Sequence, residues 1–272
     1  DVQLQAPGRG HVQPLAARHK LKHLQAAQHI AQQTGDHEQQ FKVQMEHARH
    51  KLLHARQPGE AAALLKTMIE GVPQGWNPLL VLTARALLGV ALREDGQLTA
   101  IITISRPGVE QARRYGARNL AHTLLNNTAE ALRDLGRHQE ARQTYLQALE
   151  AVRYALPLTA YAQGNLALLD IAEGHHGNAR RRLEELLGRI GGDRRRRVWL
   201  FLAAALQICL AADLETERWS EWIDALEDAA REGGQLVHET PALLRQAAQL
   251  WRQHQRPEQA TRAETLAARL DA

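Results

Sequence analysis

Apolar residues recur at three- and four-residue intervals along most of the chain, which is the spacing of one face of an α-helix. Phe41, Met45, Ala48 and Leu52 show it clearly, because they fall at positions i, i+4, i+7 and i+11. The β-branched run at residues 101–104 lies inside a helical frame and predicts no strand. The pattern therefore predicts an all-α fold.

Turn and cap signals divide this pattern into successive helices. Asn77 followed by Pro78 favours a helix start, because asparagine caps the first turn and proline fits its first position. Pro107 and Gly108 predict a kink or a short break inside a longer helix. The expected helices cover residues 14–34, 37–56, 59–70, 78–94, 97–115, 122–135, 137–154, 161–187 with a turn at 174, 198–214, 215–231, 241–254 and 257 onward.

The turns between these helices recur about every 40 residues. They hold Gly59, Gly96, Gly136, Gly174, Asp213 and Pro257, and a slot shortly after each turn holds Ala63, Ala100, Ala141, Ala179, Trp219 and Ala260. A fixed period of this length with one helix pair per period predicts an α-solenoid, in which each repeat packs only against its neighbours. Such folds bind other molecules more often than they transform them.

Two segments, residues 126–153 and 164–187, resemble tetratricopeptide (TPR) repeats. The landmarks are Leu125, Ala129, Leu132, Gly136, Ala141, Tyr145 and Ala148 for the first, and Asn165, Leu166, Ala167, Gly174, Ala179, Leu183 and Leu186 for the second. The period exceeds the motif's usual length of about 34 residues. It resembles the longer repeats of bacterial signal-transduction proteins, such as large regulatory ATPases and the C-terminal parts of some serine/threonine kinases. Residues 218–270 resemble the terminal repeats of such kinases.

This resemblance implies a right-handed α-solenoid of about five TPR-like helix pairs plus an N-terminal helix, with a concave groove for a protein or peptide. The expected role is a scaffold or sensory module of a bacterial signalling protein. The sequence contains no phosphate-binding loop, no His-Arg-Asp and no Asp-Phe-Gly motif. We therefore expect the recognition part rather than a catalytic domain, which could be attached outside this segment.

The first helices of successive TPR pairs line the concave groove, so polar residues there are candidates for binding. Asn127 and Asn165 lie equally far before Gly136 and Gly174, which makes them equivalent positions. Side-chain amides can hydrogen-bond the backbone or terminal carboxylate of an extended peptide, although they can equally satisfy local backbone groups. The expected partner-binding residues are Thr123, Asn126, Asn127, Glu130, Arg133, Tyr161 and Asn165.

Composition adds a second hypothesis. The 272 residues carry a formal net charge of +4, with 44% hydrophobic but only 4% aromatic residues. Most charges alternate in sign, as solvated helix faces do. Two runs are densely basic: Arg180–Arg182, which Glu184 and Glu185 could compensate, and a loop with Arg194, Arg195, Arg196 and Arg197. The alternative to a peptide-binding scaffold is a nucleic-acid-binding helical repeat that uses these arginines, with Trp199 for stacking.

The histidines and the remaining polar residues predict no metal site, no cofactor and no catalytic residue. His47, His50 and His54 share one helix face, and His19 and His23 lie one turn apart. Such spacing can hold Zn²⁺, but no cysteine or acidic cluster completes a site. We expect a polar, partly exposed face.

The sequence also predicts the bounds of the repeat domain and its cellular compartment. Residues 1–12 are aperiodic and Gly/Gln-rich, so we expect a flexible tail or linker before a repeat domain at residues 13–272. The first residue is Asp1, which suggests a piece of a longer protein. Cys209 is the only cysteine, and no apolar run reaches the length of about 20 residues that a membrane span needs. A cytoplasmic protein is expected.

Overall fold

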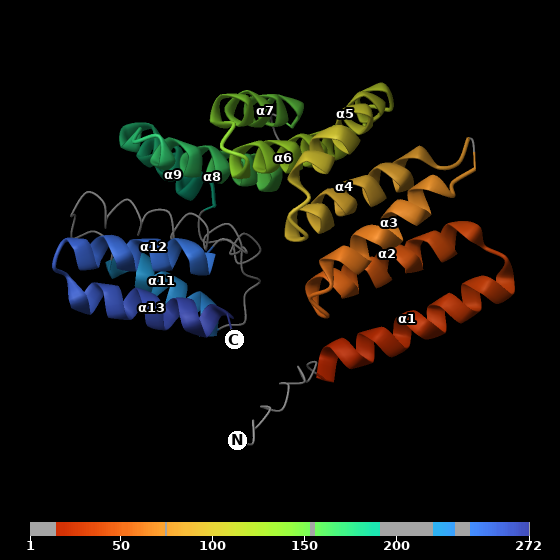
Figure 1. Ribbon diagram of the computed structural model, residues 1–272, viewed down its shortest axis with the longest axis horizontal. Coiled ribbons are helices and arrows are strands. Elements are labelled where there is room, and N and C mark those ends of the chain that lie inside the picture. Colours follow the sequence, from red (N-terminus) through yellow and green to blue (C-terminus); the bar gives the residue numbers. More distant parts are fainter. Residues whose placement is uncertain (1–14, 74, 153–155, 191–219, 232–239, 272) are drawn as a thin grey trace, which may run out of the picture. The chain divides into compact units, whose positions relative to one another are not determined.

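A computed structural model describes residues 15–73, 75–152, 156–190, 220–231 and 240–271. This part of the chain contains twelve α-helices and no strand (Figure 1). The chain divides into two compact units, residues 1–120 and 121–272. Helices of the first are α1 (Leu15–Thr34), α2 (His37–Leu53), α3 (Pro58–Glu70), α4 (Pro78–Glu94) and α5 (Leu98–Arg114). Then follow α6 (Arg118–Asp134), α7 (His138–Ala151), α8 (Leu156–Ala172), α9 (His176–Ile190), α11 (Ser220–Arg231), α12 (Thr240–Gln253) and α13 (Pro257–Asp271).

Three of the predicted turn glycines end the first helix of a pair in the same way, whereas Gly59 lies inside α3. Gly96, Gly136 and Gly174 adopt left-handed backbone conformations with φ of 75°, 74° and 74°. The residue after each glycine donates its N–H to a carbonyl five positions earlier over 2.7–2.8 Å: Gln97 to Leu92, Arg137 to Leu132 and His175 to Asp170. These bonds satisfy carbonyls that the helix itself leaves without a donor. Glycine is needed because a Cβ is strained at positive φ.

Most helix boundaries lie within three residues of the sequence prediction, but α6 begins at Arg118 and α8 at Leu156, four and five residues before the predicted starts at 122 and 161. The α4 helix begins at Pro78 behind the Asn77 cap, whose side chain accepts from the Leu79 N–H. The α2 helix ends at Leu53, because the backbone turns left-handed at Arg56 with φ of 52°. The break expected at Pro107 does not occur, and α5 continues through it. Pro107 is solvent-exposed, so water can replace the helical hydrogen bond that its ring removes.

Small side chains bring the helices of the first unit together. Successive helices from α1 to α5 pack against one another. Ala61 of α3 and Ala84 of α4 are fully buried beside Leu65 and Leu82, which are fully buried as well. Alanines at such positions let helix axes approach, and the leucines fill the space between them. This packing holds α2 and α3 side by side.

The second unit has an apolar core to which α8, α9, α11, α12 and α13 contribute. Its fully buried members include Leu183, Ile223, Leu226 and Leu244, and Trp251 is 2% exposed. Trp222 packs against this core, as expected for a structural tryptophan. The core fixes α8 and α9, which carry part of the site described below.

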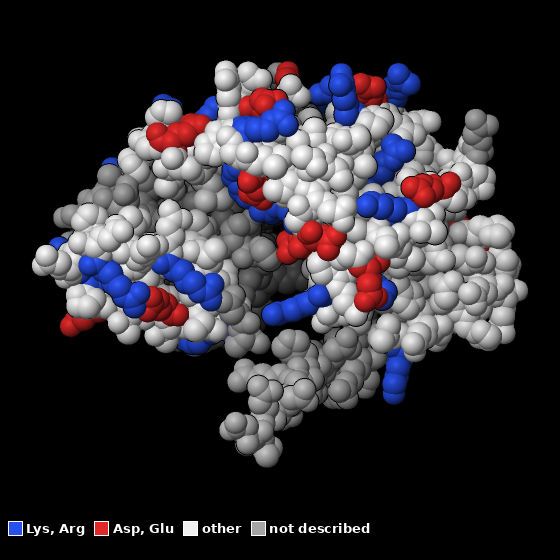
Figure 2. All heavy atoms as spheres, viewed as in Figure 1, with Lys and Arg blue, Asp and Glu red and all other residues white. Residues whose placement is uncertain are grey.

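Charged residues are interspersed on the face of the molecule shown in Figure 2. Basic and acidic side chains lie next to one another on this face. Among the described residues, Arg137 and Glu140 form an exposed ion pair at 2.7 Å. This agrees with the alternating charges in the sequence. Among the described helices, none is long and apolar enough to cross a membrane.

Candidate functional site

Side chains of α6 and α8 form a hydrogen-bonded cluster, here called the amide network: Asn126, Glu130, Arg133 and Asn165. Glu130 Oε1 accepts hydrogen bonds from Asn126 Nδ2 at 2.7 Å and from Asn165 Nδ2 at 3.1 Å. Arg133 Nη1 donates to Asn165 Oδ1 at 2.9 Å. The network joins equivalent helices of neighbouring repeats. The sequence analysis named all four as expected partner-binding residues, but it did not predict the hydrogen bonds between them.

The predicted partner-binding residues differ in how far solvent can reach them. Four are buried: Asn126, Asn127, Glu130 and Asn165 are 3%, 7%, 4% and 1% exposed. Thr123 and Arg133 are half-buried. A ligand could thus reach the last two directly. Of the buried four, Glu130 and Asn165 connect α6 with α8. The side chain of Tyr161 lies outside the described residues.

Asn126 has one polar atom without a partner. Its Nδ2 donates to Glu130, while its buried Oδ1 accepts no hydrogen bond from the described part of the chain. The reverse amide orientation would place Oδ1 against the Glu130 carboxylate, so the acceptor has to point away from Glu130. A buried carbonyl without a donor costs about 1–3 kcal/mol. The amide network is therefore incomplete as it stands.

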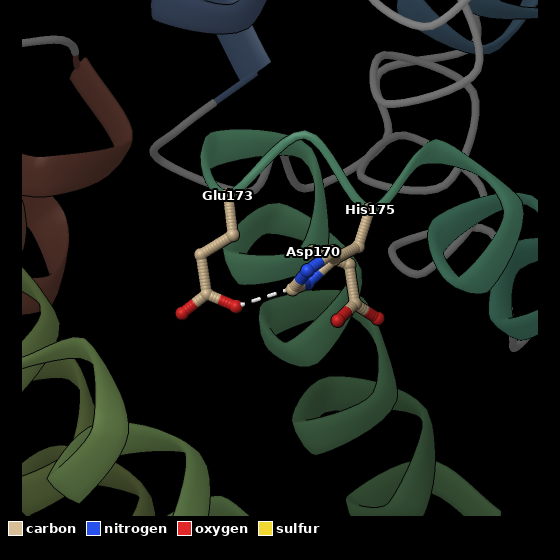
Figure 3. Close-up of side chains that lie close together, drawn as sticks. All are labelled: Asp170, Glu173 and His175. Carbon is tan, nitrogen blue, oxygen red and sulfur yellow. Dashed lines mark ion pairs between the residues drawn. The ribbon is translucent and has the colours of Figure 1, made fainter.

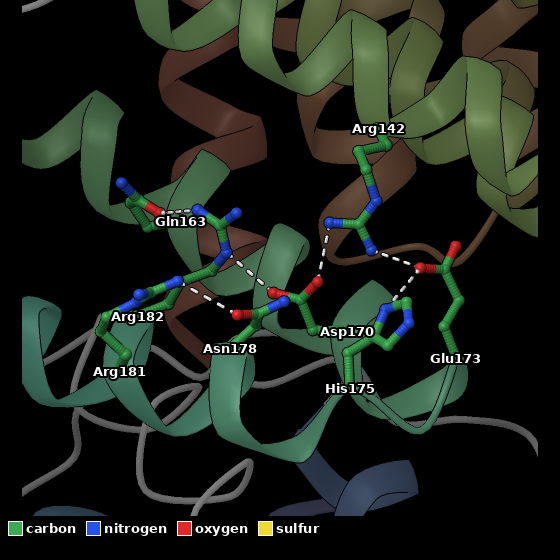
Figure 4. Close-up of polar contacts among 8 residues, drawn as sticks. All are labelled: Arg142, Gln163, Asp170, Glu173, His175, Asn178, Arg181 and Arg182. Atoms are coloured by element: carbon green, nitrogen blue, oxygen red, sulfur yellow. Dashed lines mark hydrogen bonds and ion pairs between the residues drawn. The ribbon is translucent and has the colours of Figure 1, made fainter.

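A second polar cluster, the charge network, lies on the other side of α8 and is shown in Figure 4. Its members are Arg142 of α7, Asp170 of α8, Glu173 in the turn and Arg182 of α9. Asp170 Oδ1 lies 2.7 Å from Arg142 Nη1, and Asp170 Oδ2 lies 2.8 Å from Arg182 Nε. Arg142 Nη2 also lies 2.5 Å from Glu173 Oε2. One buried carboxylate thus connects three helices.

The charge network neutralises its buried charge through ion pairs with two guanidinium groups. Asp170 is 0% exposed, and an unpaired carboxylate at such a place would cost several kcal/mol. Burial lowers the pKa of Arg142, but hydrogen bonds to Glu173 and Asp170 outweigh this effect and hold the pKa above its ordinary value. Arg142 therefore stays charged. We interpret this cluster as a structural contact.

Asp170, Glu173 and His175 present possible metal-ligand atoms within 4.8 Å of one another (Figure 3). His175 Nδ1 lies 3.3 Å from Glu173 Oε2. Both oxygens of Asp170 already face guanidinium groups, which repel a cation. The triad is therefore part of the charge network. His175 is largely exposed, as expected for a solvated turn.

The charge network is the feature that sequence reasoning missed. Asp170 interrupts the apolar run of residues 166–171, and an acidic residue in such a run is a signal for a buried, paired charge. Its partner Arg182 also donates to Gln163 Oε1 at 3.0 Å. Arg181 donates to Asn178 Oδ1 at 3.0 Å. Within this basic run, Arg181 and Arg182 therefore have partners other than the expected Glu184 and Glu185.

Several predictions fall on residues that the structure leaves undescribed. They concern the loop with Arg194, Arg195, Arg196 and Arg197, the helix at residues 198–214 with Cys209, and the tail at residues 1–12. The nucleic-acid hypothesis rests on that loop and stays a prediction.

Histidines take more buried positions than expected. His50 is 3% exposed, and its ring lies 5.2 Å from that of His54, so this helix side is not uniformly polar and exposed. Burial also lowers the pKa of His47, with an opposing contribution from a hydrogen bond to the Leu24 backbone. His122 lies 2.9 Å from the Ala148 carbonyl, and burial lowers its pKa despite this bond. His122 therefore tethers α6 to α7 in its neutral form.

The fold is that of TPR-like helical repeat proteins, as solved structures show. The apo form of RapI matches with a TM-score of 0.70 over 94% of this chain and 92% of that chain, at 10% identity. Aspartyl phosphate phosphatase F from Bacillus subtilis matches with 0.71 over 94% and 67%, at 11% identity. NprR in complex with its cognate peptide NprX matches with 0.59 over 93% and 78%, at 16% identity.

These similarities confirm the predicted TPR-like all-α repeat architecture. No family model matches the chain, and no curated protein matches it by sequence. The three structures do not bear on the expected link to a kinase, which stays a prediction.

Proposed function

We propose that the chain is a protein- or peptide-binding scaffold that recognises an extended segment at the amide network. The observation that supports this most directly is the buried Oδ1 of Asn126, which accepts no hydrogen bond from the described residues. Its amide lies beside half-buried Thr123 and Arg133, which a ligand could reach. A peptide backbone N–H is the donor that this acceptor lacks.

Binding would require the Asn126 side chain to turn outward. It would exchange its bond to Glu130 for a bidentate pair with a peptide N–H and C=O, and its Oδ1 would gain a donor. Arg133 would neutralise an acidic side chain or a terminal carboxylate of the ligand. Asn165 would keep Glu130 and Arg133 in place.

The same bonds suggest how binding could be transmitted. Glu130 and Arg133 of α6 both bond to Asn165 of α8, so a ligand that rearranges them would change the spacing of two repeats. Repeat arrays respond to such changes in small rotations between neighbours. We propose that the chain acts in this way as a sensory module of a bacterial signalling protein in the cytoplasm. The fold it shares with NprR, which was solved with a bound peptide, supports this role.

A peptide selection tests the proposal. Wild-type protein would be presented with a phage-displayed library of random ten-residue peptides, and the selected peptides would be titrated against two variants. Asn126→Ala should weaken binding by about tenfold or more, because the paired backbone bonds are lost. Asn178→Ala is the matched control, because this asparagine is exposed on α9 and bonds only to Arg181 among the contacts described above.

Two outcomes of this experiment would contradict the proposal. If the wild type enriches no peptide, or if Asn126→Ala binds the selected peptides as the wild type does, the amide network is not the recognition site. Thermal unfolding of each variant would verify that the helices remain folded at the temperature of the titration.

A further inference from the structure

The first unit contains a cavity of about 530 Å³. It lies between α2, α3 and the loop at residues 71–77 that leads to α4. Cavities of a few hundred cubic ångströms with a mainly apolar lining are typical sites for small molecules. This one belongs to the first unit alone and is separate from the amide network.

An aromatic pair and aliphatic side chains form the apolar wall. The rings of Phe41 and Trp76 meet edge to face, with centroids 4.7 Å apart and an interplanar angle of 71°. Leu64 and Met68 of α3 complete this wall. The edge-to-face arrangement fixes the Trp76 indole in one orientation, so the wall is already formed before a ligand arrives. A flat apolar group would find preorganised contacts here.

The polar part of the lining consists of His37, Gln40, Gln44 and Thr67, none of which carries a permanent charge. None of the described residues that line the cavity is a lysine, arginine, aspartate or glutamate. The Gln40 side-chain amide donates to the Ala31 carbonyl at 3.0 Å. The side chain of Gln44, by contrast, makes no hydrogen bond within the described residues. A charged ligand would lose its hydration without gaining a counter-charge. Gln44 offers one donor and one acceptor to a neutral polar group.

We propose that this cavity binds a small uncharged molecule that carries an aromatic ring and one hydrogen-bonding group. The ring would pack against Phe41 and Trp76, and the polar group would meet the Gln44 amide at the rim. The site goes beyond peptide recognition at the amide network, because it uses none of the same residues. It gives the first unit a ligand of its own.

The test uses two dyes that differ in one charged group. N-phenyl-1-naphthylamine is uncharged, has aromatic rings and one N–H, and fluoresces strongly in apolar surroundings. 8-Anilino-1-naphthalenesulfonate has the same rings and N–H plus a sulfonate. The full chain should bind the neutral dye saturably at one site, about tenfold or more tighter than the sulfonate. Equal or tighter binding of the sulfonate would overturn the proposed ligand class.

A pair of matched variants locates the dye. Thr67 is an exposed residue of α3 at the cavity, and its hydroxyl donates to the carbonyl four residues earlier. Thr67→Trp should fill the entrance and weaken the neutral dye about tenfold or more. Thr103 is an exposed residue of α5 with the same type of hydroxyl bond, but it lies outside the cavity. Thr103→Trp adds the same fluorophore and should leave dye binding unchanged.

Three results would overturn the proposal. The wild type could fail to bind the neutral dye saturably, or Thr67→Trp could bind it as tightly as Thr103→Trp does. In the third result, the wild type binds neither dye and Thr67→Trp loses a protein partner that co-purifies with the wild type. The cavity would then bind a side chain of that partner instead.

Discussion

The charge network and the amide network, both of which include α8, pair their buried carboxylates with different groups. The charge network buries Asp170 completely and places a guanidinium group against each of its oxygens. In the amide network, buried Glu130 accepts hydrogen bonds from two side-chain amides, and Asn126 Oδ1 has no donor among the described residues. Full pairing favours a fixed contact, because any change exposes a buried charge. Incomplete pairing leaves a group that a ligand can satisfy.

This difference teaches where to look for recognition in a helical repeat. Both networks lie between neighbouring repeats, and both contain buried carboxylates and arginines, so residue type alone does not separate them. The kind of partner does: each oxygen of Asp170 faces a guanidinium group in an ion pair, whereas Asn126 Oδ1 faces no donor among the described residues.

Asp170→Ala should lower the free energy of unfolding by about 3–5 kcal/mol, because it leaves Arg142 and Arg182 without their shared partner. Chemical denaturation measures this directly. The control is Asp224→Ala, which removes the exposed partner of Arg262 at the surface and should cost about 1 kcal/mol or less. Similar losses in both variants would remove the distinction between a closed network and an ordinary surface pair.

Gly136→Ala should cost about 1–2 kcal/mol of unfolding free energy, because alanine is strained at a φ of 74°. No atom lies within 4 Å of the added Cβ, so the loss would report backbone strain alone. This turn leads from the amide network on α6 to Arg142 on α7. Gly177→Ala is the control: it has the same open space within the helix α9, and it should be neutral or stabilising. A neutral Gly136→Ala would show that the turn does not hold the two helices in register.

Asn126→Ala should cost about 1 kcal/mol or less in unfolding free energy. The lost bond to Glu130 is offset, because the variant also removes a buried oxygen that has no donor. Denaturation alongside Asp170→Ala gives the comparison. A loss as large as that of Asp170→Ala would make the amide network as structural as the charge network.

Lowering the pH from 7 towards 5 should have the smallest effect. Burial lowers the pKa of His122 below the 6.5 that histidine has when unfolded. The unfolded chain therefore binds more protons, and stability falls as the pH drops below about 6.5. His122→Asn should reduce this slope. Parallel slopes in the wild type and His122→Asn would contradict the assignment.

Local signals made most of the fold predictable. Glycine at Gly136 and Gly174 specifies a left-handed turn, and an asparagine followed by proline specifies the start of α4, because these effects act within one turn of helix. The equivalent placement of Asn127 and Asn165 followed from counting to those glycines. Of the kink or short break expected at Pro107, the break does not occur, because water can reach this exposed position, and exposure cannot be read from the sequence.

Pairing across helices was not predictable in the same way. Arg133 and Asn165 are separated by 32 positions, and Asp170 meets Arg142 of the preceding helix. Which side chains meet depends on how the helices are rotated against each other. The cavity beside Phe41 and Trp76 has the same origin, because it depends on how α2, α3 and a loop pack together.

The most direct test of the central claim is a crystal structure of the chain bound to a selected peptide. The account predicts that Asn126 Oδ1 accepts a hydrogen bond from a peptide N–H, and that both ion pairs of Asp170 keep their distances. A peptide bound elsewhere, with the Asn126 amide still bonded to Glu130, would contradict it.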